Sequence, residues 1–190
     1  MAGITWLSRG CMLALVFATV GCAQFKATPY SADYEAVDRL QATKPAKVAV
    51  ETVQPSDPDA QVNNLSLRGA SFVSPSGTFS KYLEDAMVRD LKEASAFDAN
   101  SRTRLSATIL RNDIDIRSAV TGTGLMEVRV RVMRNEQQRL DKTYLANTTF
   151  ESSFGGIVAI PAGQAAYADL ARTLLRTVYS DPTFIAAIAP

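Results

Sequence analysis

The chain has 190 residues, in which 20 lysines and arginines balance 19 aspartates and glutamates, and it contains no histidine. The balanced charge argues against a nucleic-acid partner, which would require a clustered excess of basic residues. The lack of histidine excludes Ser-His-Asp and Cys-His nucleophile systems, histidine metal sites and histidine proton shuttles. We therefore expect a protein that is not an enzyme and has neither cofactor nor metal site.

Residues 1–21 have the layout of a bacterial lipoprotein signal peptide. Arg9 is their only charged side chain, and an apolar stretch follows over residues 10–20. That stretch fits a secretory signal and is about half the length that spans a bilayer. Thr19-Val20-Gly21-Cys22 then resembles a lipobox, with threonine where leucine is usual. An ordinary secretory signal, or a short N-terminal anchor with an incidental Cys22, is the alternative.

Acylation of Cys22 would, by this resemblance, attach three acyl chains such as palmitate, and several chains hold a protein to a membrane firmly. Ala23 follows, instead of the aspartate that commonly retains enterobacterial lipoproteins in the inner membrane. The resemblance thus implies an outer-membrane lipoprotein whose folded part faces the periplasm. Cys11 leaves with the signal, so Cys22 is the only mature cysteine and no intrachain disulfide can form.

The mature chain divides into two predicted parts. Residues 22–45 contain Pro29 and Pro45 and show little apolar periodicity, which predicts a lipidated flexible tether. Residues 46–190 are long enough for one periplasmic domain with its own core. Within it, the alternating β-branched residues 47–53 predict a first strand.

The next part of the chain predicts a helix. Residues 62–73 fit either a short strand or a packed loop. From Phe79 onward, apolar residues recur three and four apart, which is typical of one helix face. Ser76 or Thr78 could cap this helix, which ends within residues 94–100.

Residues 104–117 predict a strand with a defect. Apolar residues occupy odd positions up to Ile109 and even positions from Ile114. Because side chains alternate between the faces of a strand, this switch predicts a bulge near residues 110–112.

The C-terminal third predicts a hairpin and two helices. Residues 125–134 alternate cleanly, residues 135–138 form a polar turn, and residues 139–152 return as a partner strand. An amphipathic helix follows over residues 165–178, and Asp181-Pro182 starts a short terminal helix. The order β-α-β-β-β-α predicts an α+β two-layer sandwich, with a mixed four-stranded sheet and two helices on one face.

Two sites are candidates for function. Asp113 and Asp115 share a strand face and could hold a cation or form an acid–base pair, but Arg111 and Arg117 on that face favour a solvated charge ladder. The second is the apolar segment before the last long helix. It could cover the core, or be a lip offered to a partner or an acyl chain. Its residues are Phe154, Gly155, Gly156, Ile157, Val158 and Ile160.

The mature chain resembles the YajG-type family of small Gram-negative outer-membrane lipoproteins. The resemblance covers residues 47–188. It rests on four motifs, which are Ser76-Gly77-Thr78-Phe79 leading into Tyr82-Leu83, the strand ending in Asn112-Asp113, Glu151-Ser152-Ser153-Phe154 before Ala159-Ile160-Pro161, and Asp181-Pro182-Thr183-Phe184-Ile185. It implies an envelope lipoprotein and supplies no catalytic residues.

Three functions remain in competition at this point. The first is a non-enzymatic accessory subunit that binds an envelope protein through the apolar segment or an unpaired sheet edge. The second is an accessory lipoprotein of an envelope transport system that binds lipid or lipopolysaccharide, which needs a cavity or groove between helices and sheet. The third is an enzyme using Asp113 and Asp115, which needs both carboxyls in a cleft with raised pKa values.

Overall fold

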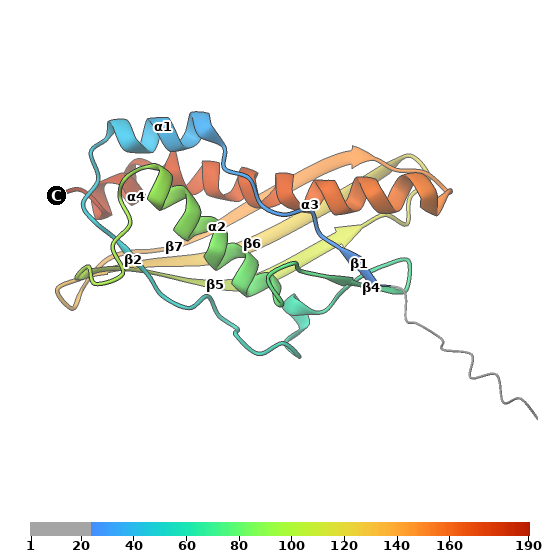
Figure 1. The fold of residues 1–190 in the computed structure, drawn as a ribbon, viewed down its shortest axis with the longest axis horizontal. Coiled ribbons are helices and arrows are strands. Elements are labelled where there is room, and N and C mark those ends of the chain that lie inside the picture. The colour runs from blue at the N-terminus through green and yellow to red at the C-terminus, as the bar shows by residue number, and fades with distance from the viewer. Residues whose placement is uncertain (1–23) are drawn as a thin grey trace, which may run out of the picture.

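The structure is a computed structural model that describes residues 24–190. Its main layer is a four-stranded sheet in which one strand pair is parallel and the other two are antiparallel. Two helices cover one face of this sheet (Figure 1). The predicted α+β sandwich with a mixed sheet is therefore confirmed. In sheet order the strands are β2 (Ala49–Val50), β5 (Thr103–Asp115), β6 (Thr121–Arg134) and β7 (Gln137–Glu151), and the helices are α2 (Phe79–Glu93) and α3 (Gly156–Tyr179).

A second, smaller sheet was not predicted. It joins the start of the described chain to part of residues 62–73, whose sequence fits either a short strand or a packed loop. The turn between its two antiparallel strands is Arg68-Gly69, with φ of 51° and 81°. Its strands, in sheet order, are β1 (Gln24–Lys26), β4 (Ala70–Val73) and β3 (Leu65–Leu67), and the remaining elements are α1 (Tyr34–Ala42), the 3-10 helix η1 (Gln61–Asn63) and α4 (Pro182–Ala187).

The predicted tether is wrong for the residues that the structure describes. β1 pairs in parallel with β4, and α1 begins at the N-cap Asp33, whose side chain accepts a hydrogen bond from Ala36 N. Tyr30 and Leu40 are buried against the rest of the domain. A few buried side chains thus pack this otherwise polar stretch against the core. The signal peptide and Cys22 lie outside the described residues.

The predicted cap and bulge are both found. Thr78, not Ser76, caps α2, and its Oγ1 accepts a hydrogen bond from Lys81 N at 3.0 Å. In β5 the register shifts between Ile109 and Arg111. The extra residue turns Ile114 inward, where it is buried, as the change of parity requires.

The β6–β7 hairpin is confirmed, with a tighter turn than predicted. Its two turn residues, Asn135 and Glu136, both have positive φ, at 49° and 66°. Two such residues make a type I′ turn, whose twist matches that of the flanking strands.

Helix α3 begins nine residues before the predicted start, at Gly156. The glycines and Pro161 in this stretch predict a break, yet the structure continues the helix through Pro161. Proline removes the hydrogen bond to the carbonyl four residues earlier, here that of Ile157. Because Ile157 lies in the exposed first turn, its carbonyl can be hydrated instead.

The core has an aromatic centre at Tyr167 of α3, which is fully buried. Its ring centroid lies 4.5 Å from that of Phe79, 5.4 Å from that of Tyr82 and 5.8 Å from that of Phe72. Asn112, just past the bulge in β5, donates a hydrogen bond to the Tyr167 hydroxyl at 3.0 Å. This cluster joins α2, α3 and both sheets.

Candidate functional site

Four large apolar side chains are exposed together at one end of the domain. Phe154, Ile157 and Val158 stand at the start of α3, and Val120 lies in the β5–β6 turn. Ser152 N donates to Val120 O at 3.0 Å, which holds the two segments side by side. Their exposed fractions are 82%, 89%, 51% and 73%, respectively. We call these four residues the apolar tip.

The predicted segment 154–160 therefore divides into an outer and an inner part. Phe154, Ile157 and Val158 face outward, whereas Ala159 is buried and Ile160 packs against the core. Gly155 is the N-cap of α3 and provides no side-chain hydrogen bond. Because the segment is helical from Gly156 onward, one side of it covers the core and the other side is exposed to solvent.

A single arginine holds the backbone of the tip. The guanidinium of Arg68, in the β3–β4 turn, donates hydrogen bonds to the carbonyls of Ser153, Phe154 and Ile116. The last of these is 3.2 Å long. The fork of guanidinium donors can satisfy three acceptors at once, which a lysine cannot do with the same geometry. Sequence reasoning did not identify Arg68.

Replacing Arg68 with alanine should loosen the tip without unfolding the domain. The carbonyls of Ser153 and Phe154 would lose the hydrogen bonds from Arg68, so amide hydrogen exchange over residues 153–158 should accelerate while the melting temperature falls only slightly. Arg117→Ala is the matched control, because Arg117 pairs with Asp115 and makes no hydrogen bond to these carbonyls. Unchanged exchange at the tip in Arg68→Ala would contradict this role for the guanidinium.

The described chain begins beside the tip. Gln24, the first residue of β1, pairs with Ser71, which lies three residues after Arg68. The next residues of β1 are fixed to α3, because Gln164 Nε2 donates to Lys26 O at 2.7 Å. Cys22 precedes Gln24 by two residues, and two Cα–Cα steps span at most about 7.6 Å.

The carboxylate pair does not have the properties of an acid–base site. Asp113 is exposed, and Asp115 is bound by Arg117, whose Nε lies 3.0 Å from both carboxylate oxygens. These hydrogen bonds lower the pKa of Asp115, whereas a general acid needs a raised pKa. The charge-ladder interpretation therefore accounts for this site better than the enzymatic one.

The space between helices and sheet is filled. An enclosed void there has a volume of about 10 Å³, and Leu83 of α2, Val128 of β6 and Leu174 of α3 are among its lining residues. That is scarcely room for one water molecule, so an acyl chain does not fit. This weighs against the cavity that the lipid-binding alternative requires.

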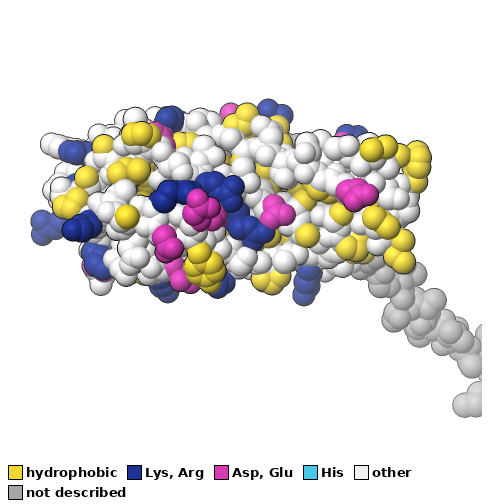
Figure 2. Space-filling model, turned by 90° about the horizontal axis from the view of Figure 1, so that it is seen from above, with side chains coloured by type: hydrophobic (Ala, Val, Ile, Leu, Met, Phe, Trp, Pro, Cys, Tyr) yellow, Lys and Arg dark blue, Asp and Glu magenta, His cyan; other side chains and the backbone are white. Residues whose placement is uncertain are grey.

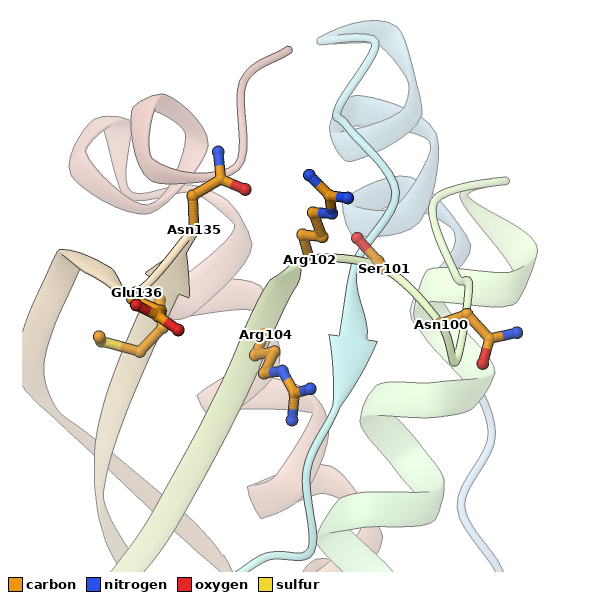
Figure 3. A pocket seen from close by; sticks show the side chains of 7 residues that line it. Asn100, Ser101, Arg102, Arg104, Asn135 and Glu136 are labelled. Atoms are coloured by element: carbon orange, nitrogen blue, oxygen red, sulfur yellow. The ribbon is translucent and has the colours of Figure 1, made fainter.

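A further hollow lies at the β6–β7 turn, and it is open to solvent. It has a volume of about 700 Å³. Figure 3 shows Arg102 and Arg104 at the start of β5 on one side and Asn135 and Glu136 of the turn on the other. Arg104 Nη1 also lies 3.4 Å from a carboxylate oxygen of Glu51. Met133 is the one apolar residue among the seven that line this hollow, which therefore offers little surface to a lipid tail.

None of the helices within residues 24–190 is long and apolar enough to cross a bilayer. The same residues contain no group of three His, Cys, Asp or Glu side chains that could hold a metal ion.

Comparison with solved structures shows that other proteins share the fold of this chain. No family model and no curated protein sequence matches the chain. A Xanthomonas campestris protein of the family DUF330 has a similar structure, with a TM-score of 0.58 and 13% identity over 86% of this chain and 96% of its own. A hypothetical protein from Chlamydia trachomatis has a TM-score of 0.50 and 12% identity, over 75% of this chain and 99% of its own. A candidate lipoprotein from Caulobacter crescentus has a TM-score of 0.46 and 15% identity, over 80% of this chain and 97% of its own. This structural similarity is too low to support an inference.

Proposed function

We propose that the protein is an outer-membrane lipoprotein, acylated on Cys22 and facing the periplasm, that acts as a non-enzymatic accessory subunit by binding an envelope protein. The lipobox-like residues 19–22 and the resemblance to YajG-type lipoproteins support the anchor. The observation that carries the proposal is the position of β1. Because β1 starts two residues after Cys22 and is paired within the domain, the anchor would hold the whole domain close to the membrane surface.

The free edge of β7 is suited to a protein partner. Among the described strands, β7 pairs with β6 alone. Charged residues and prolines are usual means of blocking an edge strand. Residues 144–150 of β7 contain neither. An extended segment of a partner could therefore add to this edge as a further strand, with main-chain hydrogen bonds supplying the affinity.

Crosslinking in native envelopes tests this proposal. A photo-reactive residue at Asn147, which is exposed on β7, should capture one reproducible envelope protein, identified by mass spectrometry. Thr108, in the interior strand β5, is the matched control position and should give much less product if the partner adds at the edge. Equal capture at both positions, or only abundant envelope proteins at Asn147, would contradict strand addition.

A further inference from the structure

We propose that the apolar tip inserts into the lipid surface that holds Cys22, as a second, non-covalent contact with the membrane. This inference rests on the proposed acylation. The partner that contacts the apolar tip is then a lipid bilayer and not a protein. The contacting side chains are Val120, Phe154, Ile157 and Val158.

Only a short length of chain separates the proposed lipid anchor at Cys22 from the folded domain, which begins at Gln24. An acylated Cys22 would lie in the bilayer interface, and Gln24 would then be within about 7.6 Å of it. That is comparable to the depth of one headgroup layer, about 5–8 Å. The end of the domain at which β1 begins must therefore meet the membrane.

The tip is at that end. Gln24 pairs with Ser71, three residues beyond Arg68, and Arg68 holds the carbonyls of Ser153 and Phe154. In Figure 1 the start of β1 and the start of α3 lie at the same end of the molecule. The four apolar side chains thus project from the end that the anchor brings to the membrane.

The chemistry of this end fits a lipid interface. Between Glu151 and Asp169 the chain has no charged residue, although the first turn of α3 is exposed. Figure 2 shows charged side chains over the middle of the molecule and apolar ones at the end where α3 begins. The four exposed apolar side chains would leave water on insertion, so the tip would add appreciably to membrane attachment. Arg117, largely exposed beside the tip, could contact anionic headgroups.

A tryptophan reporter can locate the tip. Trp6 is the only tryptophan of the chain and would leave with the signal peptide, so Phe154→Trp gives the mature protein a single fluorophore. The acylated protein would be reconstituted in vesicles of phosphatidylethanolamine and phosphatidylglycerol. We expect its emission to move to shorter wavelength and to be quenched several-fold by brominated acyl chains. Adding Ile157→Asp to this variant should weaken the quenching.

Tyr34→Trp is the matched control, because Tyr34 is also an exposed aromatic residue. It adjoins Asp33, whose carboxylate lies 2.6 Å from Nε of Arg176, and Arg176 is about 30 Å along α3 from Gly156. Quenching should therefore be weak at this position. Equal quenching at positions 154 and 34, or none at 154, would overturn tip insertion. Shielding of position 154 in native envelopes but not in vesicles would identify a protein occupant and also overturn it.

Acylation is tested separately, by the mass of the N-terminal peptide and by flotation of the protein with the vesicles. Failure of both would refute the proposed lipoprotein. Flotation with an unquenched tryptophan at position 154 would refute tip insertion alone.

Discussion

Replacing Tyr167 with alanine should lower the free energy of unfolding by about 3–5 kcal/mol, the range for removing a buried aromatic side chain. The Tyr167 ring is fully buried and contacts Phe72, Phe79 and Tyr82. These neighbours come from the small sheet and from α2, so the cavity would open where separate layers meet. Chemical denaturation of a soluble form starting at Ala23 measures the effect.

Tyr167→Phe is the control for packing. It keeps the ring and removes only the hydroxyl, which accepts a hydrogen bond from Asn112 Nδ2 and donates one to Asn112 Oδ1 at 3.2 Å. The expected loss is about 1 kcal/mol, because Asn112 Nδ2 keeps its bond to Val62 O at 2.9 Å. A loss of similar size in both variants would show that the hydrogen bond, not the aromatic contacts, stabilises this centre.

Asp90→Asn should stabilise the domain at neutral pH and have little effect in acid. Asp90 is buried on α2, where desolvation raises its pKa to about 6 from an ordinary value of 3.8. Tyr30 donates a hydrogen bond to its Oδ2 at 2.7 Å, but Oδ1 has no partner in the described residues. Arg89, Asp33 and the Tyr179 hydroxyl are the other titratable groups near it.

The direction of the pH effect follows from the raised pKa. Below about pH 4 the carboxyl is neutral in both states, and as the pH rises the unfolded state loses its proton first. The wild-type protein should therefore lose up to about 3 kcal/mol of stability between about pH 4 and pH 6, relative to Asp90→Asn. Unfolding in urea across this range measures the difference, which should stay constant above about pH 7. A difference that does not vary with pH would contradict a raised pKa.

Asp181→Asn should change the pH dependence of stability in the opposite direction to Asp90→Asn. Partial burial alone would raise the pKa of Asp181, but hydrogen bonds from Lys142, Tyr144 and Thr183 outweigh it and hold the pKa well below its usual range. The stability that ionised Asp181 contributes is present above about pH 4 and is lost as the pH falls. This variant should therefore be less stable than wild type at neutral pH, with the deficit shrinking in acid.

Long, strongly periodic elements could be predicted from the sequence. The three-and-four spacing after Phe79 and the alternation of β6 both correspond to elements with one buried face. The bulge in β5 was also predictable, because a change of parity in an amphipathic strand has few other physical explanations. By contrast, β1 has three residues and α1 has nine, so their positions depend on tertiary contacts such as that between Tyr30 and Asp90.

The candidate site was found only in part. Its apolar residues were conspicuous in the sequence, but Gly155, Gly156 and Pro161 concealed the helix that separates Ile157, which is exposed, from Ile160, which packs inward. Arg68 could not be predicted to hold the tip, because it is 85 residues away from Ser153 along the chain. The YajG-type resemblance and acylation of Cys22 stay predictions.

The parallel pairing of β1 with β4 sets how the domain would respond to mechanical load. A force on the acyl anchor would act along β1 and shear its three residue pairs with β4. Yielding of these pairs and of the segment up to α1 would release residues 24–33. At about 3.4 Å per residue, this segment would be about 34 Å long when fully extended, which is longer than the folded path it replaces. The domain could then move away from the membrane under tension and return when the strand paired again.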